Sequence, residues 1–213
     1  GTIDGHYKAF RAVQRNDVCP ICGLSRIASR YESVREAYDH YLPKSLYPFN
    51  SINFRNLVPM CHKCNSGYKG TSDPLHRVEG TRRPAFYLYS EEPSDISIQI
   101  TIRDIGSTGI NGEAIELELV AERRAFEVET WNEVFDIRRR YIAACADEGE
   151  YWIESVFEAA EVYGISPDEA LRKQLAVAKN HPFMDENFLK APFLEACEGR
   201  GIFARVQESG TRV

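Results

Sequence analysis

The stretch NLVPMCHKCNSGYKG at residues 56–70, together with CPIC at residues 19–22, decides the fold. Each stretch holds two cysteines separated by two residues. Two such pairs, in a chain whose first residues show no secretion signal, predict a tetrahedral zinc site rather than a disulfide framework. One pair alone is also found in redox proteins, but a second pair and Gly23 after the first favour zinc. We expect one structural Zn²⁺ to be bound by Cys19, Cys22, Cys61 and Cys64.

The composition is that of an ordinary globular protein, with 213 residues, 43% hydrophobic and 27% charged. No apolar run approaches the roughly 18 residues of a transmembrane helix, so we expect a cytoplasmic protein that does not cross a membrane. The net charge of −6 conceals a division. Residues 1–90 carry 13 Lys and Arg against 7 Asp and Glu, net +6, whereas residues 91–213 carry 13 against 25, net −12. The first part suits a polyanionic partner, and the acidic part is a candidate surface for a protein partner.

Between and after the cysteine pairs the sequence predicts short elements. Residues 39–43 and 54–59 are β-capable stretches that end at proline, as strands do when they open into loops. Residues 65–70 are expected to form a short helix that ends at glycine. Residues 71–94 are rich in Pro, Gly, Ser and Arg and are expected to form an irregular connector.

The acidic part is predicted to combine a β-hairpin with helices. Residues 96–102 and 114–120 alternate apolar and polar side chains, which is typical of half-buried strands. The glycines of residues 106–112 superficially resemble a phosphate loop, but no Lys-Ser/Thr pair and no helix follows, so a hairpin turn is favoured. Thr130 and Glu133 have capping-box spacing, and Ser166 precedes Pro167, so both sites predict helix starts.

The elements of the basic part occur in a recognisable order. Asp39-His40 is followed by Pro43, then by Asn56, and then by the second cysteine pair, with Asn65 directly behind it. Over residues 15–70 this pattern resembles the HNH endonucleases, in the zinc-knuckle branch of the ββα-metal nucleases. The resemblance implies an α+β chain, with a ββα-metal finger and Cys₄ zinc knuckles in an HNH domain at residues 1–90. An accessory region of hairpin and helices at 91–213 would follow.

The resemblance also implies roles for four residues in metal-dependent hydrolysis of DNA phosphodiester bonds. His40 would be the general base, because imidazole has a proton-accepting fraction near pH 7. Asp39 would bind the catalytic divalent ion, and Asn56 would hold the loop between the strands and orient His40. Asn65 stands where the family commonly has histidine; its amide oxygen is a harder ligand, which suits Mg²⁺ or Mn²⁺.

Basic side chains near this pattern are candidate phosphate contacts; each one alone is better explained as a solvated surface charge, but together they favour a nucleic-acid-binding face. They are Lys44, Arg55, Lys63 and Lys69, with Arg82 and Arg83 further along. The alternative to a nuclease is a non-catalytic zinc-knuckle module that binds nucleic acid or acts as an adaptor. Stand-alone HNH proteins of this kind resemble effectors of bacterial anti-phage or restriction systems, which suggests a role in antiviral defence.

Overall fold

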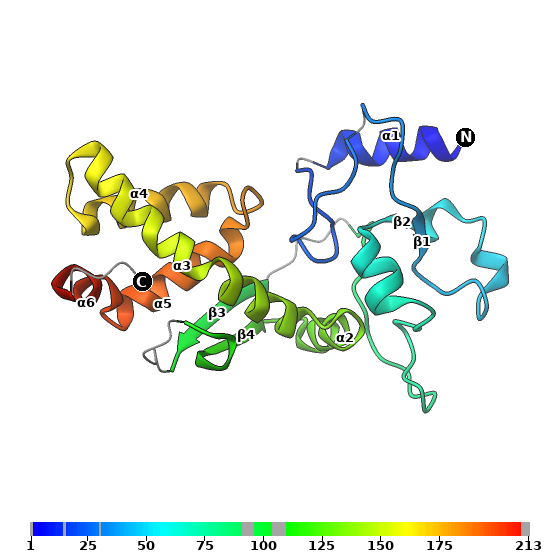
Figure 1. Ribbon diagram of the computed structural model, residues 1–213. Helices are drawn as coiled ribbons and strands as arrows, with labels where there is room; N and C mark the ends of the chain where they lie inside the picture. Colours follow the sequence, from blue (N-terminus) through cyan, green and yellow to red (C-terminus); the bar gives the residue numbers. More distant parts are fainter. Residues whose placement is uncertain (1, 15, 30, 91–95, 104–109, 210–213) are drawn as a thin grey trace. The chain divides into compact units, whose positions relative to one another are not determined.

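The computed structural model describes residues 2–14, 16–29, 31–90, 96–103 and 110–209 (Figure 1). Its contacts divide into two compact units, one of residues 1–96 with 121–137 and one of residues 97–120 with 138–213. The mixture of helices with small sheets confirms the α+β class. Residues 121–137 belong to the first unit although they follow residue 90, where the charge pattern placed the domain boundary.

The described residues of the first unit form two α-helices, two very short strands and several helical turns. They are α1 (Ile3–Val13), β1 (Tyr38–His40), the 3₁₀ turns η1 (Pro48–Asn50) and η2 (Phe54–Asn56), β2 (Leu57–Pro59), the π-helix η3 (Lys63–Lys69) and α2 (Ala125–Phe135). Strands β1 and β2 are antiparallel, with Asp39 opposite Val58 and His40 opposite Leu57. The chain therefore runs from a strand pair into a short helical segment at the second cysteine pair.

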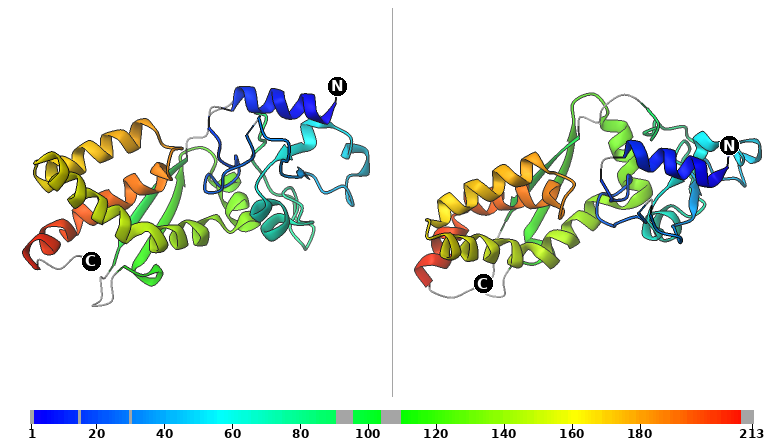
Figure 2. Two further views of the ribbon diagram at one scale, coloured as in Figure 1. Left: turned by 45° about the horizontal axis from the view of Figure 1, so that its top comes forward. Right: turned by 90° about the horizontal axis from the view of Figure 1, so that it is seen from above.

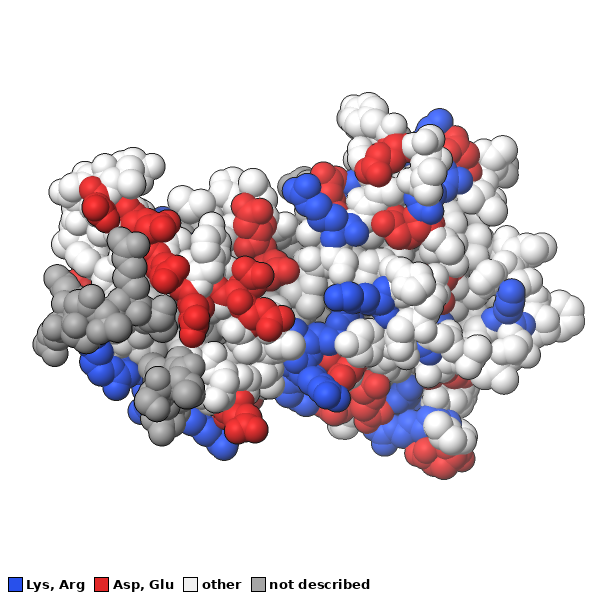
Figure 3. Space-filling view, in the orientation of Figure 1, with Lys and Arg blue, Asp and Glu red and all other residues white. Residues whose placement is uncertain are grey.

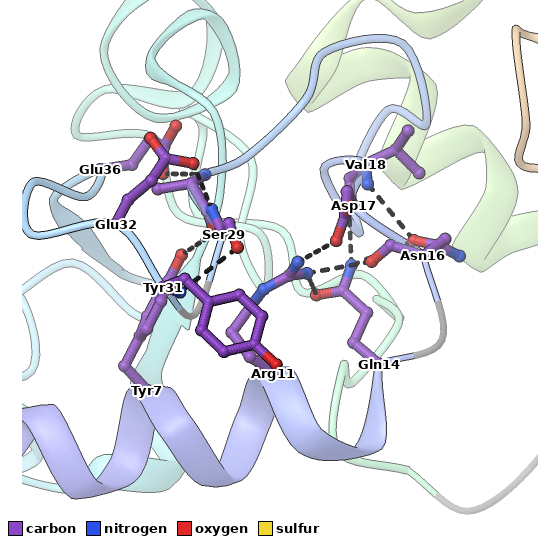
Figure 4. Close-up of polar contacts among 11 residues, drawn as sticks. Tyr7, Arg11, Gln14, Asn16, Asp17, Val18, Ser29, Tyr31, Glu32 and Glu36 are labelled. Carbon is purple, nitrogen blue, oxygen red and sulfur yellow. Dashed lines mark hydrogen bonds and ion pairs between the residues drawn. The ribbon is translucent and has the colours of Figure 1, made fainter.

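Helix α1 orders the chain that leads to the first cysteine pair (Figure 4). The buried Arg11 guanidinium donates to the carbonyl oxygen of Asn16 over 2.9 Å and forms an ion pair with Asp17. Gln14 continues these contacts, because its Nε2 donates to the carbonyl oxygen of Val18 over 2.7 Å. Two of these bonds satisfy the carbonyl oxygens of Asn16 and Val18, just before Cys19.

The predicted connector packs back onto the strand pair. The Tyr89 hydroxyl donates to the carbonyl oxygen of Leu57 over 2.5 Å, and the Tyr41 hydroxyl donates to that of Phe86 over 2.5 Å. Burial raises the pKa of both Tyr41 and Tyr89, so the two phenols stay protonated donors at neutral pH. An irregular segment thus covers an otherwise two-stranded sheet, which is too small to be stable alone.

In its described residues, the second unit combines a two-stranded sheet with four helices (Figure 2). Its elements are β3 (Ile96–Ile102), the 3₁₀ turn η4 (Gly112–Ala114), β4 (Ile115–Ala121), α3 (Ile137–Tyr163), α4 (Pro167–Asn180), α5 (Asn187–Gly199) and α6 (Ile202–Ser209). Both predicted strands are confirmed. Most of the turn predicted at residues 106–112 lies outside the described residues. Within the described parts of the chain, no helix has the length and apolar character needed to cross a lipid bilayer.

One of the two predicted helix starts is confirmed and the other is wrong. Ser166 is the N-cap of α4, and its hydroxyl accepts from the backbone N–H of Glu169 over 3.2 Å, with Pro167 in the first turn. Thr130, in contrast, is buried inside α2, which begins at Ala125. Apolar residues on both sides of Thr130 extend that helix, so its capping-box spacing is coincidental.

The core of the second unit is closely packed where α3 meets α5. A Cβ at Gly149 would lie 2.5 Å from the ring of Phe193, so only glycine permits this approach. The same ring packs edge-to-face on Trp152 at 5.4 Å between centroids. Cys145 and Cys197 are fully buried in this unit, as expected of small apolar side chains.

Candidate functional site

Four cysteine side chains meet inside the first unit. They are Cys19, Cys22, Cys61 and Cys64. Their Sγ atoms all lie within 4.8 Å of one another, and all four residues are buried. Four soft sulfur donors at this separation suit a metal such as zinc, which prefers tetrahedral thiolate ligands. The predicted ligand group is therefore confirmed as a cluster that could hold such an ion.

The first pair lies in a tight turn. The backbone N–H of Cys19 donates to the carbonyl oxygen of Ser25 over 2.7 Å, and that of Gly23 donates back to Cys19 over 2.9 Å. Gly23 has a φ of 68°, in the left-handed region that glycine adopts without steric cost. The indole N–H of Trp131, on α2, donates to the carbonyl oxygen of Ile21 over 2.9 Å and ties this turn to the helix.

The second pair joins the first through the backbone and through sulfur. The N–H of Cys61 donates to Sγ of Cys19 over 3.3 Å. The pKa of the Cys22 thiol is lowered, first by the hydrogen bond from Cys19, and the same bond raises the pKa of Cys19. The pKa of Cys61 is lowered as well, whereas that of Cys64 is raised, so the shared protons favour thiolate at Cys22 and Cys61. A divalent cation would take the place of those protons and neutralise the thiolates together.

His40 ends strand β1 and contacts the loop that follows. Its Nε2 lies 3.0 Å from the carbonyl oxygen of Ser51. Alternate side chains of a strand point to opposite faces, and the adjacent Asp39 accordingly contacts a different partner. Sequence reasoning missed Ser51, because a residue that acts through its backbone carbonyl leaves no signal in its side-chain type.

Asp39 lies in a buried ion pair with Lys69 of η3. The Lys69 ammonium is 3.1 Å from Oδ2 of Asp39 and donates to Oδ1 over 3.3 Å, and it also donates to the carbonyl oxygen of His40 over 3.0 Å. The Lys69 side chain is 0% exposed. Burial raises the pKa of Asp39, and the ammonium opposes this shift. Lys69, which the sequence made a candidate phosphate contact, is therefore buried and joins η3 to β1.

We expect Lys69→Met to lower the free energy of unfolding of the first unit by about 3–5 kcal/mol, because it leaves a buried carboxylate without its counter-charge. Trp131 emission during urea unfolding, in a Trp152→Phe background, would follow this unit alone. Lys63→Met, at an exposed position of the same helix, is the matched control and should change stability by less than about 0.5 kcal/mol. Equal stability of the two variants would contradict a structural ion pair.

The side chain of Asn56 forms hydrogen bonds with the backbone of the loop between β1 and β2. Its side chain is buried; Oδ1 accepts from the N–H of Leu42 over 2.7 Å, and Nδ2 donates to the carbonyl oxygen of Leu42 over 3.0 Å. Nδ2 also donates to the carbonyl oxygen of Asn50 over 3.2 Å. Asn50 immediately precedes Ser51, so the same amide that closes the loop also fixes the carbonyl that His40 contacts.

The remaining predicted residues lie nearer the surface. Asn65 is half-buried, and its Nδ2 donates to the carbonyl oxygen of Ala37 over 3.3 Å, just before β1. The side chains of Lys44, Arg55, Lys63 and Arg82 are exposed. Arg83 instead forms an ion pair with Glu133 of α2, which Arg77 also contacts. Helix α2 is thus joined to this unit by a carboxylate as well as by Trp131, although it lies far away in the sequence.

Comparison with known proteins gives one local similarity. The chain is 50% identical over 42 residues to a Bacillus thuringiensis protein named Septu protein PtuB. The aligned segment covers 20% of this chain and 16% of that protein. No known family profile matches the chain. No solved structure matches it.

Proposed function

We propose that this protein is a metal-dependent endonuclease of the HNH type that hydrolyses DNA phosphodiester bonds, with His40 as its general base. The hydrogen bond between His40 and the carbonyl oxygen of Ser51 carries the proposal. A carbonyl oxygen only accepts, so the neutral ring keeps its proton on Nε2 and its lone pair on Nδ1. The loop backbone therefore prepares Nδ1 of His40 to accept a proton.

Hydrolysis of a phosphodiester requires a water molecule to lose a proton while its oxygen attacks phosphorus. Nδ1 of His40 takes this proton as the new P–O bond forms, and the bond to the leaving oxygen breaks. The leaving oxygen receives a proton from solvent. Asn56 supports the step by holding the loop that orients His40.

Asp39 and Asn65 are the residues that would hold the catalytic Mg²⁺ or Mn²⁺, since a carboxylate and an amide oxygen suit hard cations. When bound, the ion supplies positive charge that stabilises the pentavalent phosphate. Oδ2 of Asp39 accepts no hydrogen bond from the described residues, which leaves a lone pair for a cation. Lys69 lies 3.1 Å from that oxygen, so the ammonium must shift before Asp39 can serve as a ligand.

The charge distribution supports nucleic acid as the substrate. Residues 40–72 contain no Asp or Glu, although the chain has 32 acidic residues in all. Lys69 is neutralised by Asp39, which leaves three exposed basic side chains on this segment. They are Lys44, Arg55 and Lys63. A segment of this kind attracts phosphates and carries no acidic side chain of its own to repel them.

A non-catalytic zinc-knuckle module is the second candidate, and one observation favours it. The Asp39–Lys69 ion pair engages the carboxylate that a catalytic ion would need. If that pair is permanent, the same basic surface would bind nucleic acid or a partner without cutting it. The two candidates differ in whether bound DNA is cleaved, which makes cleavage the deciding measurement.

The similarity to a Septu protein supports, for the proposed nuclease, a place in a bacterial anti-phage system. The second unit would provide the contact with a partner protein. Acidic side chains gather over its helices in the view of Figure 3. On α3 the exposed acids are Asp147, Glu148, Glu150, Glu158 and Glu161. Such a surface disfavours DNA and suits a basic partner.

Plasmid nicking tests the proposal. The full chain is incubated with supercoiled plasmid in Mg²⁺, in Mn²⁺ and in EDTA, and protein-bound zinc is measured afterwards. We expect open-circular product with either ion and none in EDTA, with zinc retained in every sample. Retained zinc would assign the loss of cleavage to a second, weakly held ion. Plasmid that is bound but remains supercoiled with both ions would contradict the nuclease and favour the binding module.

A further inference from the structure

Three large apolar side chains project from the loop between β1 and β2. Phe49 is 96% exposed, Ile52 87% and Leu46 61%. We call these three residues the apolar tip. Exposed apolar residues are common singly, but three within seven residues form a surface that is expected to have a binding role.

The tip is held in a defined conformation. Tyr47 donates its N–H to the carbonyl oxygen of Pro43 over 2.9 Å. Asn50 donates to Tyr47 over 3.0 Å, and Ser51 donates to Pro48 over 3.2 Å. Successive turns of this kind fix the backbone that carries the apolar side chains. Their binding therefore has a small cost in backbone ordering.

Two further contacts anchor the loop at its sides. The Tyr47 hydroxyl donates to Oδ2 of Asp73 over 2.7 Å, and that carboxylate also lies 3.0 Å from Nδ1 of His76. On the other side, Nδ2 of Asn56 donates to the carbonyl oxygen of Asn50. The loop is thus attached both to the connector and to the base of the strand pair.

The tip adjoins the proposed general base. Ser51, whose carbonyl oxygen His40 contacts, is next to Ile52 and two residues from Phe49. Whatever binds the tip therefore lies beside the phosphate that the water activated by His40 would attack. The tip also stands in the acid-free segment of residues 40–72, with Lys44 on one side and Arg55 on the other.

We propose that the apolar tip inserts between stacked bases of the DNA substrate and opens one base step next to the scissile phosphate. This inference rests on the proposed function. Bases are the apolar part of nucleic acid, and proteins that unstack a step use Phe, Leu or Ile wedges flanked by basic residues that bind phosphate. Apolar and basic side chains together match both parts of that ligand, and the Asp73 carboxylate that contacts this loop is engaged by Tyr47 and His76. A protein partner could bind the apolar residues, but it would not explain why residues 40–72 contain no Asp or Glu.

The test measures binding and base unstacking separately from cleavage. Full-length His40→Ala protein is added to mixed-sequence duplexes that carry 2-aminopurine, whose fluorescence rises when it is unstacked. We expect a rise with this protein, and loss of the rise when Phe49→Ala and Ile52→Ala are added. Affinity should fall about 5- to 100-fold, the range seen when an aromatic stacking residue is removed. Phe126→Ala, at a 76% exposed position on α2, is the matched control and should leave both signals unchanged.

The outcomes distinguish the two proposals. If plasmid is nicked by the wild type but the tip variant binds and unstacks DNA as well as its parent, the wedge is overturned and the nuclease stands. If neither the wild type nor the His40→Ala protein binds DNA, both proposals are overturned. Zinc content and Trp131 emission should be the same in all variants, because the tip side chains are exposed and support no core.

Discussion

Replacing His40 with alanine is expected to slow plasmid nicking by about 10²- to 10⁴-fold, the usual contribution of a positioned general base. The loss has a specific origin, since alanine offers no group to accept the proton of the attacking water. Stability should change little, because His40 is half-buried and its ring makes one described hydrogen bond, to the carbonyl oxygen of Ser51. The measurement is the initial nicking rate in Mg²⁺, with zinc content determined on the same sample.

His62→Ala is the matched control for this experiment. His62 is exposed and immediately precedes η3, in the same unit. Its removal should leave the nicking rate within about twofold of the wild type, as expected for a surface substitution outside the reacting atoms. Equal rates for His40→Ala and wild type would end the assignment of His40 as the base. A comparable loss in both variants would indicate that charge on this surface, rather than proton transfer, limits the reaction.

The parts of the fold that sequence predicts well are those that depend on neighbouring residues. The alternation of residues 96–102 places β3, because a two-residue period is decided by adjacent side chains. Ser166 marks the start of α4 for the same reason. Gly23 and the two cysteine pairs predict a cluster that the structure assembles from positions about forty residues apart, since ligand spacing encodes that geometry.

The parts that sequence does not predict depend on distant contacts. Trp131 joins α2 to the first cysteine turn across 110 residues, and nothing near Trp131 distinguishes it from an ordinary core residue. Lys69 is a similar case, because a lysine near a phosphate site and a lysine paired with Asp39 look identical in sequence. Burial of a charge is decided by what folds over it, which no local pattern records.

The loop between β1 and β2 shows how the two kinds of information combine. Asn56 was expected to hold this loop, and its side chain does contact both Leu42 and Asn50. The role of that contact in catalysis stays a prediction. The exposure of Phe49 carries no sequence signal, because phenylalanine is more often buried than exposed. The residue type therefore predicts core, and only the structure places it at the surface.

Replacing Cys61 with serine is expected to remove zinc and unfold the first unit. Structural zinc contributes on the order of 10–16 kcal/mol in small zinc-binding peptides, comparable to the whole stability of a domain. The strands of the first unit have three residues each, so its small sheet contributes little to hold the cysteine turns together. Zinc stoichiometry should fall to near zero. Trp131 emission, read in a Trp152→Phe background, should shift towards that of a solvent-exposed indole.

Cys145→Ala separates loss of the metal ligand from loss of a buried sulfur. Cys145 is as deeply buried as Cys22 but lies in the second unit, outside the cluster. This variant should lose stability through a small cavity while zinc content and Trp131 emission stay those of the wild type. If Cys61→Ser kept both its zinc and its melting temperature, the four sulfurs would not form a structural site. The first unit would then be stabilised by its protein contacts, such as the Asp39–Lys69 pair and those of α1 and α2, and chelation would leave its unfolding unchanged.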